Sequence, residues 1–117
     1  MADASIFDMT KLLENTCDDK ELAAQVVGVF LTDIPVQFRD LEQALAGGDI
    51  KTAERVCHSI KGASATVGGE ALREIAYTCE RLGHDCDLDG LKERAAELRA
   101  QFDRLNETLR NEGFVEA

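Results

Sequence analysis

The 117-residue sequence has little of what breaks a helix or builds an aromatic core: it contains one proline, no tryptophan, one tyrosine and five phenylalanines. Hydrophobic residues nevertheless make up 44% of the chain, so we expect a helical protein with an aliphatic core. No internal repeat is visible, and no alternation of apolar and polar residues indicates a β-strand. The length suits a single packed core, and we predict one helical domain over residues 1–117.

Basic residues are also scarce, because 13 lysines and arginines stand against 23 acidic residues, for a formal net charge of −10. Binding to nucleic acid depends mainly on clustered basic side chains, so neither nucleic acid nor an anionic membrane is an expected partner. The longest apolar run, residues 26–31, is far too short to cross a bilayer, and no positively charged leader opens the chain. We therefore expect a cytoplasmic protein without membrane insertion.

The four cysteines, Cys17, Cys57, Cys79 and Cys86, contain no C-x-x-C pair. Cys57 and Cys79 fall on apolar stripes, where a free cysteine behaves as a small hydrophobic residue. A disulfide framework would be expected only for a secreted chain. We interpret all four as reduced thiols.

The apolar residues that are present recur at intervals of three and four, as on the buried face of a helix. The pattern is most regular near the end of the chain, at Leu91, Ala95, Leu98, Phe102, Leu105 and Leu109. It predicts an all-α fold, an antiparallel up-down four-helix bundle over about residues 19–111. A short additional helix is expected before it, at about residues 8–16.

Helix boundaries are indicated by residues that suit helix ends. Aspartates that can cap a helix start occur at Asp8, Asp18, Asp19 and Asp49. Glycines that can end a helix occur at Gly47, Gly48, Gly68, Gly69 and Gly83. Pro35 has no backbone N–H and disfavours helical geometry at Ile34, so the first bundle helix is expected to kink or restart there.

Residues 57–68 are the part of the chain that this scaffold does not explain. In a helix, one face would carry the residues of the buried stripe, Ile50, Ala53, Cys57, Ile60, Ser64 and Val67. His58 points away from that stripe. The residues that share or flank its outer face are Glu54, Arg55, Lys61, Gly62 and Ala65.

The outer face combines three properties that suit chemistry on phosphate. His58 is a nucleophile that titrates near neutral pH, and Lys61 supplies a cation for a phosphoryl oxygen. Gly62 costs about 1 kcal/mol relative to alanine inside a helix, but it leaves bare backbone where another molecule can approach. Ser64 lies toward the buried stripe, where its hydroxyl is expected to bond the carbonyl one turn earlier.

The order His58, Lys61, Gly62, Ser64, Gly68, Leu72 closely resembles the signature of histidine-containing phosphotransfer (HPt) domains. The resemblance covers nearly the whole chain and implies an α-helical bundle that carries phosphoryl groups in a multistep two-component phosphorelay. His58 would accept a phosphoryl group from a receiver-domain aspartate and pass it to another receiver, forming phosphohistidine.

The resemblance also implies roles for the neighbouring residues and for the partners. Lys61 would support the phosphoryl group, and Gly62 would give the receiver room. Helix geometry, apart from the resemblance, adds Arg55, Glu54 and Ala65 to Gly62 as expected docking residues, with Ser64 and Gly68 structural. The partners would be response-regulator receiver domains or a hybrid sensor kinase, and any Mg²⁺ would be held by the receiver rather than by this chain. We expect a monomeric carrier that needs its partners and is not an enzyme.

Other interpretations remain open at this level. A single surface histidine usually has no specific function, so the chain could be a helical adaptor that binds a partner without accepting phosphate. Residues 85–90 begin like a calcium loop, but Ala96 stands where the bidentate glutamate is needed, and a helix cap explains the same residues. His84 and Cys86 alone do not fill a tetrahedral zinc site, so a metal-binding bundle is the weakest alternative.

Overall fold

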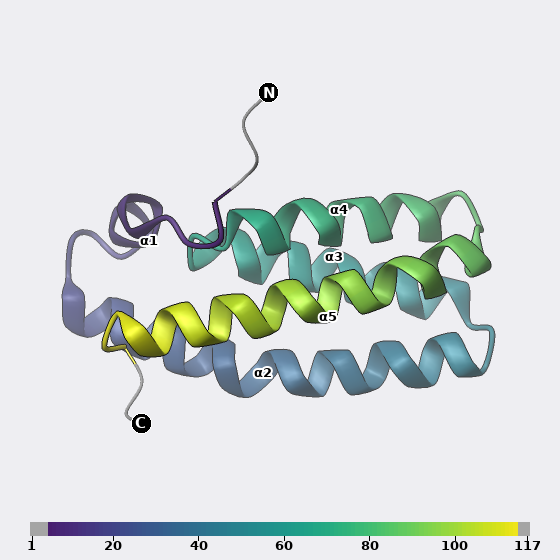
Figure 1. The fold of residues 1–117 in the computed structure, drawn as a ribbon, viewed down its shortest axis with the longest axis horizontal. Coiled ribbons are helices and arrows are strands. Elements are labelled where there is room, and N and C mark those ends of the chain that lie inside the picture. Colours follow the sequence, from purple (N-terminus) through teal and green to yellow (C-terminus); the bar gives the residue numbers. More distant parts are fainter. Residues whose placement is uncertain (1–4, 115–117) are drawn as a thin grey trace.

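The computed structural model describes residues 5–114, which form five α-helices and no strand (Figure 1). Four long helices run alongside one another in alternating directions, and a short first helix lies across one end. Their bounds are α1 Met9–Asn15, α2 Lys20–Ala46, α3 Ile50–Thr66, α4 Glu70–His84 and α5 Leu88–Asn111. The predicted all-α four-helix bundle with an additional N-terminal helix is confirmed. The predicted domain also includes residues 1–4 and 115–117, which lie outside the described ones.

Aspartate side chains cap four of the five helices in this part of the chain, as their short acceptor oxygens allow. The capping residues are Asp8 for α1, Asp19 for α2, Asp49 for α3 and Asp87 for α5. Each accepts a hydrogen bond from a backbone N–H two or three residues ahead. The helix α4 begins after Gly69 without a side-chain cap. Local chemistry therefore explains most of the helix starts.

Of the two outcomes expected at Pro35, a restart does not occur, because helix α2 continues through the proline. A proline inside a helix removes one backbone hydrogen bond and disfavours the conformation of the residue before it. Here Ile34 on one side and Phe38 on the other are both buried in the core. Packing of these side chains outweighs the local preference of proline, as tertiary contacts often do.

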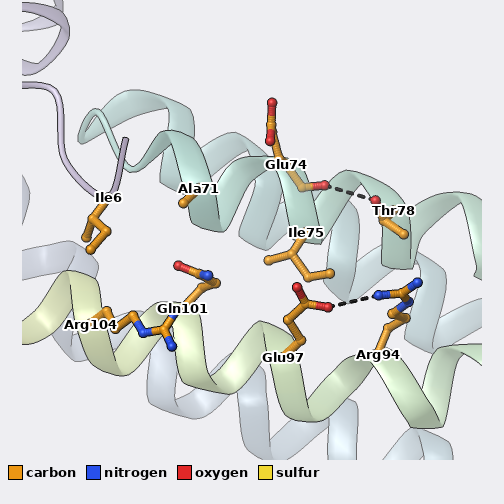
Figure 2. A pocket seen from close by; sticks show the side chains of 9 residues that line it. All are labelled: Ile6, Ala71, Glu74, Ile75, Thr78, Arg94, Glu97, Gln101 and Arg104. Carbon is orange, nitrogen blue, oxygen red and sulfur yellow. Dashed lines mark hydrogen bonds and ion pairs between the residues drawn. The ribbon is translucent and has the colours of Figure 1, made fainter. Parts of the chain in front are cut away.

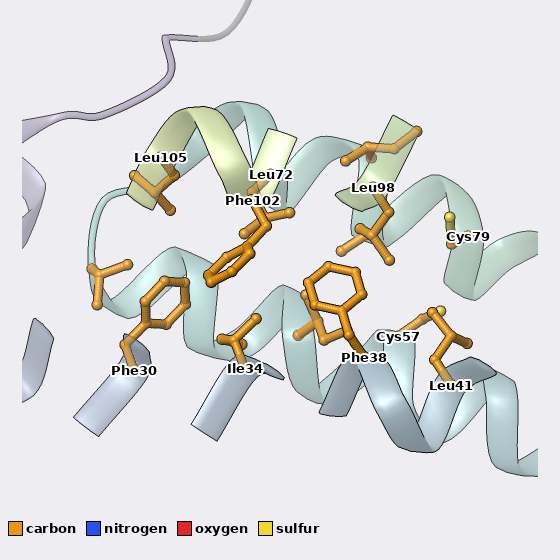
Figure 3. Packing of buried hydrophobic residues seen from close by; sticks show 14 of the residues in the cluster. Phe30, Ile34, Phe38, Leu41, Cys57, Leu72, Cys79, Leu98, Phe102 and Leu105 are labelled. Atoms are coloured by element: carbon orange, nitrogen blue, oxygen red, sulfur yellow. The ribbon is translucent and has the colours of Figure 1, made fainter. Parts of the chain in front are cut away.

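The core lies between the four long helices and is mainly aliphatic, as the composition predicts. Three phenylalanines meet in it, since the ring of Phe102 lies 6.1 Å from that of Phe30 and 5.5 Å from that of Phe38 (Figure 3). Cys57 and Cys79 are buried and Cys17 and Cys86 are exposed, and all four are free thiols. Within residues 5–114, no helix has the length and hydropathy needed to cross a membrane.

Gly68 joins the short helix α1 to the turn between α3 and α4. Its φ of +78° lies in the left-handed region, and a Cβ there would collide with the backbone of Asp8. The backbone N–H of Asp8 donates to the carbonyl of Gly68 at 2.8 Å. The glycine therefore holds α1 against this end of the bundle, at the opposite end from the turn that Gly48 makes between α2 and α3.

Candidate functional site

His58 stands on the outer face of α3, with 66% of its side chain exposed. Its helix buries the opposite face through Ala53, Cys57, Ile60 and Ser64. The register therefore fixes the direction of the imidazole, as the spacing of the apolar residues predicts. An exposed ring on an element anchored by its other face is available to a second molecule without unfolding of the helix.

The ring of His58 is oriented by a carboxylate that sequence reasoning missed. Nδ1 lies 2.8 Å from Oε2 of Glu80, which comes from the neighbouring helix α4. An ionised carboxylate only accepts hydrogen bonds, so Nδ1 must carry the proton and donate it. In the neutral ring, Nε2 is then left with a free lone pair, which is the atom that can attack an electrophile.

Glu80 also binds Lys61, whose Nζ lies 2.7 Å from the other carboxylate oxygen, Oε1. The side chain of Glu80 is 20% exposed. Partial burial by itself raises the pKa of its carboxyl, but the hydrogen bonds and charges of Lys61 and His58 outweigh that effect. The pKa of Glu80 is therefore lowered, and the carboxylate is ionised at neutral pH.

A positional signal for Glu80 does exist in the sequence, although it is weak. His58 lies ten residues before Gly68, and Glu80 lies eleven residues after Gly69. Two antiparallel helices joined by a tight turn bring residues at such matched distances to the same level. Glu80 also follows Cys79, a core residue, so it occupies the edge of the buried stripe of α4.

Lys61 is held beside His58 on the α4 side of the site. Its ammonium lies 5.3 Å from the centre of the Tyr77 ring, a cation–π distance, and Arg81 lies 5.8 Å from the same ring. The side chain of Lys61 is only 26% exposed. The predicted pair of nucleophile and cation is therefore brought together, with Glu80 between its members.

Gly62 leaves open space one turn beyond His58, because a Cβ built on it would meet no atom within 4 Å. It is exposed, and Arg55 is exposed on the same face of α3. Nothing within the described part of the chain fills this space, so internal packing does not require a glycine at position 62. The clearance that the sequence suggests is present beside the imidazole.

The remaining residues predicted near the site have contacts of their own. Glu54 is half-buried and turns toward the end of α4, where its Oε2 lies 3.5 Å from Nδ1 of His84. Ala65 is half-buried, and the amide of Asn15 approaches its carbonyl. The hydroxyl of Ser64 donates to the carbonyl of Ile60 at 2.6 Å, in the arrangement that the sequence predicts. These residues are less accessible than Gly62 and Arg55.

An apolar groove of about 160 Å³ lies between α2 and α3, on the side of His58 away from Glu80. From α3 it is lined by Ala63, Thr66 and Val67, and from α2 by Val26, Val29, Phe30, Asp33, Ile34 and Gln37. Val29 is 60% exposed and Val36, one heptad later on α2, is 45% exposed. Ala63 follows Gly62 directly, so the groove continues the open face beside the imidazole. The exposed valines were not predicted to belong to the site.

A second and larger groove, of about 470 Å³, lies between α4 and α5 and contains no residue of the His58 cluster (Figure 2). Its walls are mainly polar: Glu74 and Thr78 come from α4, and Arg94, Glu97, Gln101 and Arg104 come from α5. Arg94 pairs with Glu97 at 3.0 Å, and the hydroxyl of Thr78 donates to the carbonyl of Glu74. This groove offers neither an exposed nucleophile nor an apolar surface continuous with His58.

The acidic stretch after α4 is the start of a helix. The side chain of Asp87 accepts from the N–H of Gly90 at 2.9 Å, and residues from Leu88 onward are helical. The capping interpretation of this stretch therefore holds, and its backbone does not follow a calcium-binding loop. His84 faces Glu54, whereas the thiol of Cys86 lies 4.0 Å from the carbonyl oxygen of His84.

Comparison with known proteins connects this geometry to one family. The sequence model of the Hpt domain family matches residues 25–109. Multistep phosphorelay regulator 1 of Schizosaccharomyces pombe is 29% identical over 98 residues, which is 83% of this chain. The matched region covers 32% of the length of that relative, about a third.

Two solved structures have the same fold. Histidine-containing phosphotransfer protein B of Pseudomonas aeruginosa superposes with a TM-score of 0.86 at 20% identity, covering 93% of this chain and 95% of that one. The HPT domain of a sensor hybrid histidine kinase from Shewanella superposes with a TM-score of 0.76 at 17% identity, covering 96% and 97%. Both likenesses concern the arrangement of the helices.

Proposed function

Since the chain belongs to the Hpt domain family and is a phosphotransfer carrier, we propose that His58 is the residue that carries the phosphoryl group. In this proposal, His58 accepts the group from the aspartyl phosphate of a receiver domain and delivers it to another receiver. The observation that carries the assignment is the arrangement of the imidazole, which is exposed at 66% while Nδ1 is engaged by Glu80. The other histidine, His84, also lies near a carboxylate, that of Glu54 at 3.5 Å, but no lysine pairs with Glu54 within the described residues.

The transfer step needs no proton to leave the ring. Nε2 of His58 attacks the phosphorus of the acyl phosphate, the P–N bond forms, and the P–O bond to the aspartate breaks with release of its carboxylate. Nδ1 keeps its proton and the phosphorylated ring becomes cationic. The carboxylate of Glu80, 2.8 Å away, stabilises that charge. The return transfer reverses the same steps.

Lys61 is proposed to neutralise charge on the phosphoryl oxygens. Phosphoryl transfer depends mainly on positioning and on compensation of charge at the equatorial oxygens. When the ring of His58 becomes cationic, Glu80 gains a second strong partner, and the ammonium of Lys61 can turn from Glu80 toward the dianionic group. The Mg²⁺ of the reaction is proposed to belong to the receiver, so the chain alone catalyses no turnover.

The receiver is proposed to dock across the open side of His58. Gly62 gives clearance for its approach, Arg55 supplies a cation on the same face, and the apolar groove beside Ala63 supplies hydrophobic contact. This surface includes Val29 of α2, which is exposed to water without an internal reason. Glu54 and Ala65 would form the rim of the contact.

The assignment is tested by incubation with a receiver domain phosphorylated on its aspartate. The wild-type chain is expected to take up acid-labile, base-stable label, and His58→Gln none. His84→Gln is the matched control, because it removes the second of the two histidines and should label like the wild type. Label that persists in His58→Gln would place the phosphorylated residue elsewhere, and a wild type that takes up no label would favour the adaptor interpretation.

A further inference from the structure

Two buried thiols lie directly beneath the proposed phosphorylation site and have no part in the mechanism above. Cys57 of α3 and Cys79 of α4 are both 0% exposed. Figure 3 shows them at the same end of the core, near Leu41. In the sequence, Cys57 immediately precedes His58, and Cys79 immediately precedes Glu80. The two cysteines are therefore attached to the same two turns of helix as the site above them.

The register of the two helices places the thiols at one level. The helices α3 and α4 are antiparallel, and His58 of one meets Glu80 of the other at 2.8 Å. One turn away, a Cβ on Gly83 would lie 2.9 Å from that of Glu54, which shows how closely the backbones approach there. Cys57 and Cys79 lie between these two contacts, close enough that each thiol shifts the pKa of the other.

The two thiols are not equivalent. The neighbouring thiol of Cys79 has the largest effect in raising the pKa of Cys57, and burial raises it further. The neighbouring thiol of Cys57 lowers the pKa of Cys79, which burial alone would raise. Because a thiolate is the reactive form of cysteine, Cys79 is the thiol of the pair that ionises and reacts first. Cys57 is then the thiol placed to react with the product.

We propose that Cys57 and Cys79 form a reversible disulfide when the protein meets hydrogen peroxide, and that this bond slows phosphotransfer at His58. The effect on transfer rests on the proposed function of His58, whereas formation of the bond does not. The pair would thus make the carrier sensitive to oxidation at the contact between the two helices that form its site.

The oxidation balances with peroxide as the only co-reactant. The thiolate of Cys79 attacks one peroxide oxygen, the O–O bond breaks, and sulfenic acid and water result after proton uptake. The sulfur of Cys57 then attacks the sulfur of that sulfenic acid and displaces its hydroxide. The hydroxide takes the proton of the Cys57 thiol and leaves as a second water. Two thiols and one peroxide therefore give one disulfide and two waters, and a dithiol reductant reverses the change.

Burial selects the oxidant. Both sulfurs lie beneath the surface, so a small neutral molecule such as hydrogen peroxide can reach them during local opening. Glutathione disulfide is too large to attack them in the folded chain. The exposed thiols of Cys17 and Cys86 react with either oxidant, so they must be removed before the buried pair is examined.

A disulfide would disturb the site above it because it shortens the distance between the sulfurs. Non-bonded sulfur atoms in contact are farther apart than the roughly 2.05 Å of a disulfide bond. Closing that gap moves the turns that carry His58 and Glu80, whose 2.8 Å contact orients the ring. A misplacement of about 1 Å in a reacting group can lower a rate by about a hundredfold, and we expect transfer to slow at least tenfold.

The experiment uses the full chain with Cys17→Ser and Cys86→Ser. Hydrogen peroxide is expected to lower its intact mass by two hydrogen atoms, while glutathione disulfide leaves the mass unchanged. The oxidised protein should exchange phosphate with a receiver at least tenfold more slowly than the reduced protein, and dithiothreitol should restore the rate. Circular dichroism before and after oxidation checks that the helices persist.

Two single variants in the same background, Cys79→Ala and Cys57→Ala, are the controls. Neither can form the bond, so peroxide should leave their transfer rates unchanged, and one of them suffices if the other does not fold. The proposal is overturned if peroxide produces no cross-link in the folded chain, or if the cross-linked protein transfers at the reduced rate. A reduced protein that cannot be phosphorylated on His58 would instead show that the proposed function has failed.

Discussion

Glu80 orients His58: its carboxylate accepts a hydrogen bond from Nδ1 at 2.8 Å and holds Lys61 at 2.7 Å with its other oxygen. One acidic side chain from α4 thereby sets the tautomer of a histidine on α3 and balances the cation beside it. The other ring nitrogen, Nε2, is left unprotonated in the neutral ring.

Glu80→Gln should slow phosphotransfer without displacing the helices. The amide keeps the size of the side chain but loses the charge that fixes the Nδ1–H tautomer and stabilises the phosphorylated ring. A hydrogen bond to a charged group contributes about 1.5–3 kcal/mol, so transfer should fall on the order of ten- to a hundredfold. Rapid-quench kinetics with a labelled receiver measure the rate of phosphotransfer. Glu74→Gln, an exposed carboxylate of the same helix, is the control and should retain the wild-type rate.

Gly62→Gln should raise helix stability and yet slow transfer from a receiver. Glycine costs about 1 kcal/mol inside a helix, and a side chain at position 62 meets no atom of the described chain. The matched control is Gly28→Gln on α2, because a Cβ at Gly28 also meets nothing within 4 Å and Gly28 does not line the groove. Thermal unfolding should show both variants gaining stability. Equal transfer rates for the two variants would remove the clearance argument.

Val29→Glu should weaken receiver docking and leave the chemistry of His58 intact. The substitution puts a charge at the mouth of the apolar groove, so the receiver concentration for half-maximal transfer should rise about tenfold or more, since burial of one unpaired charge costs at least 1.4 kcal/mol. Phosphoramidate, a small phosphodonor that needs no docking surface, should label the variant like the wild type. Ala100→Glu on the exposed side of α5 serves as the control. Unchanged receiver affinity in Val29→Glu would exclude the groove from the interface.

Acid should destabilise the wild type more than Glu80→Gln. The pKa of Glu80 is lowered in the folded state, so the folded chain binds fewer protons there than the unfolded chain does. The stabilisation is complete above the unfolded pKa of about 4.3 and is lost as the pH falls through the folded value. Urea unfolding between neutral pH and the acid range measures it. Parallel curves for the two proteins across that range would show that the ion pairs of Glu80 do not stabilise the fold.

Gly68→Ala should destabilise the bundle more than Gly48→Ala. Both glycines have positive φ, +78° and +70°, which costs an alanine on the order of 1–3 kcal/mol. Only at Gly68 would the added Cβ also collide with the backbone of Asp8, so the difference between the two variants isolates the docking of α1. Chemical denaturation compares them. An equal loss of stability in both would mean that displacing α1 does not lower the free energy of unfolding.

Much of the site follows from helix geometry, which is local. The spacing of Cys57, Ile60 and Ser64 decides which way His58 points, because residues along one helix are related by a constant rotation. The caps at Asp8 and Asp49 are local in the same sense, since each side chain bonds backbone only three residues ahead. The family signature read from His58 to Leu72 led to the family that comparison shows.

The continuity of α2 and the identity of Glu80 were beyond such reasoning. Pro35 argues for an interruption when judged by its neighbours alone, but the buried side chains of Ile34 and Phe38 keep the helix whole. Glu80 lies 22 residues from His58 and contacts it because α3 and α4 pack in one particular register. That register depends on the fit of the whole core.

Most helix bounds and caps, the outward direction of His58 and the bare backbone at Gly62 follow from local sequence, because each depends on residues within a few turns of one another. Packing between helices is needed to keep α2 continuous, to place Glu80 between His58 and Lys61, to leave an apolar groove between α2 and α3, and to bring Cys57 and Cys79 together. Those contacts join residues from different helices, and the free energy that selects them is the packing of the bundle as a whole.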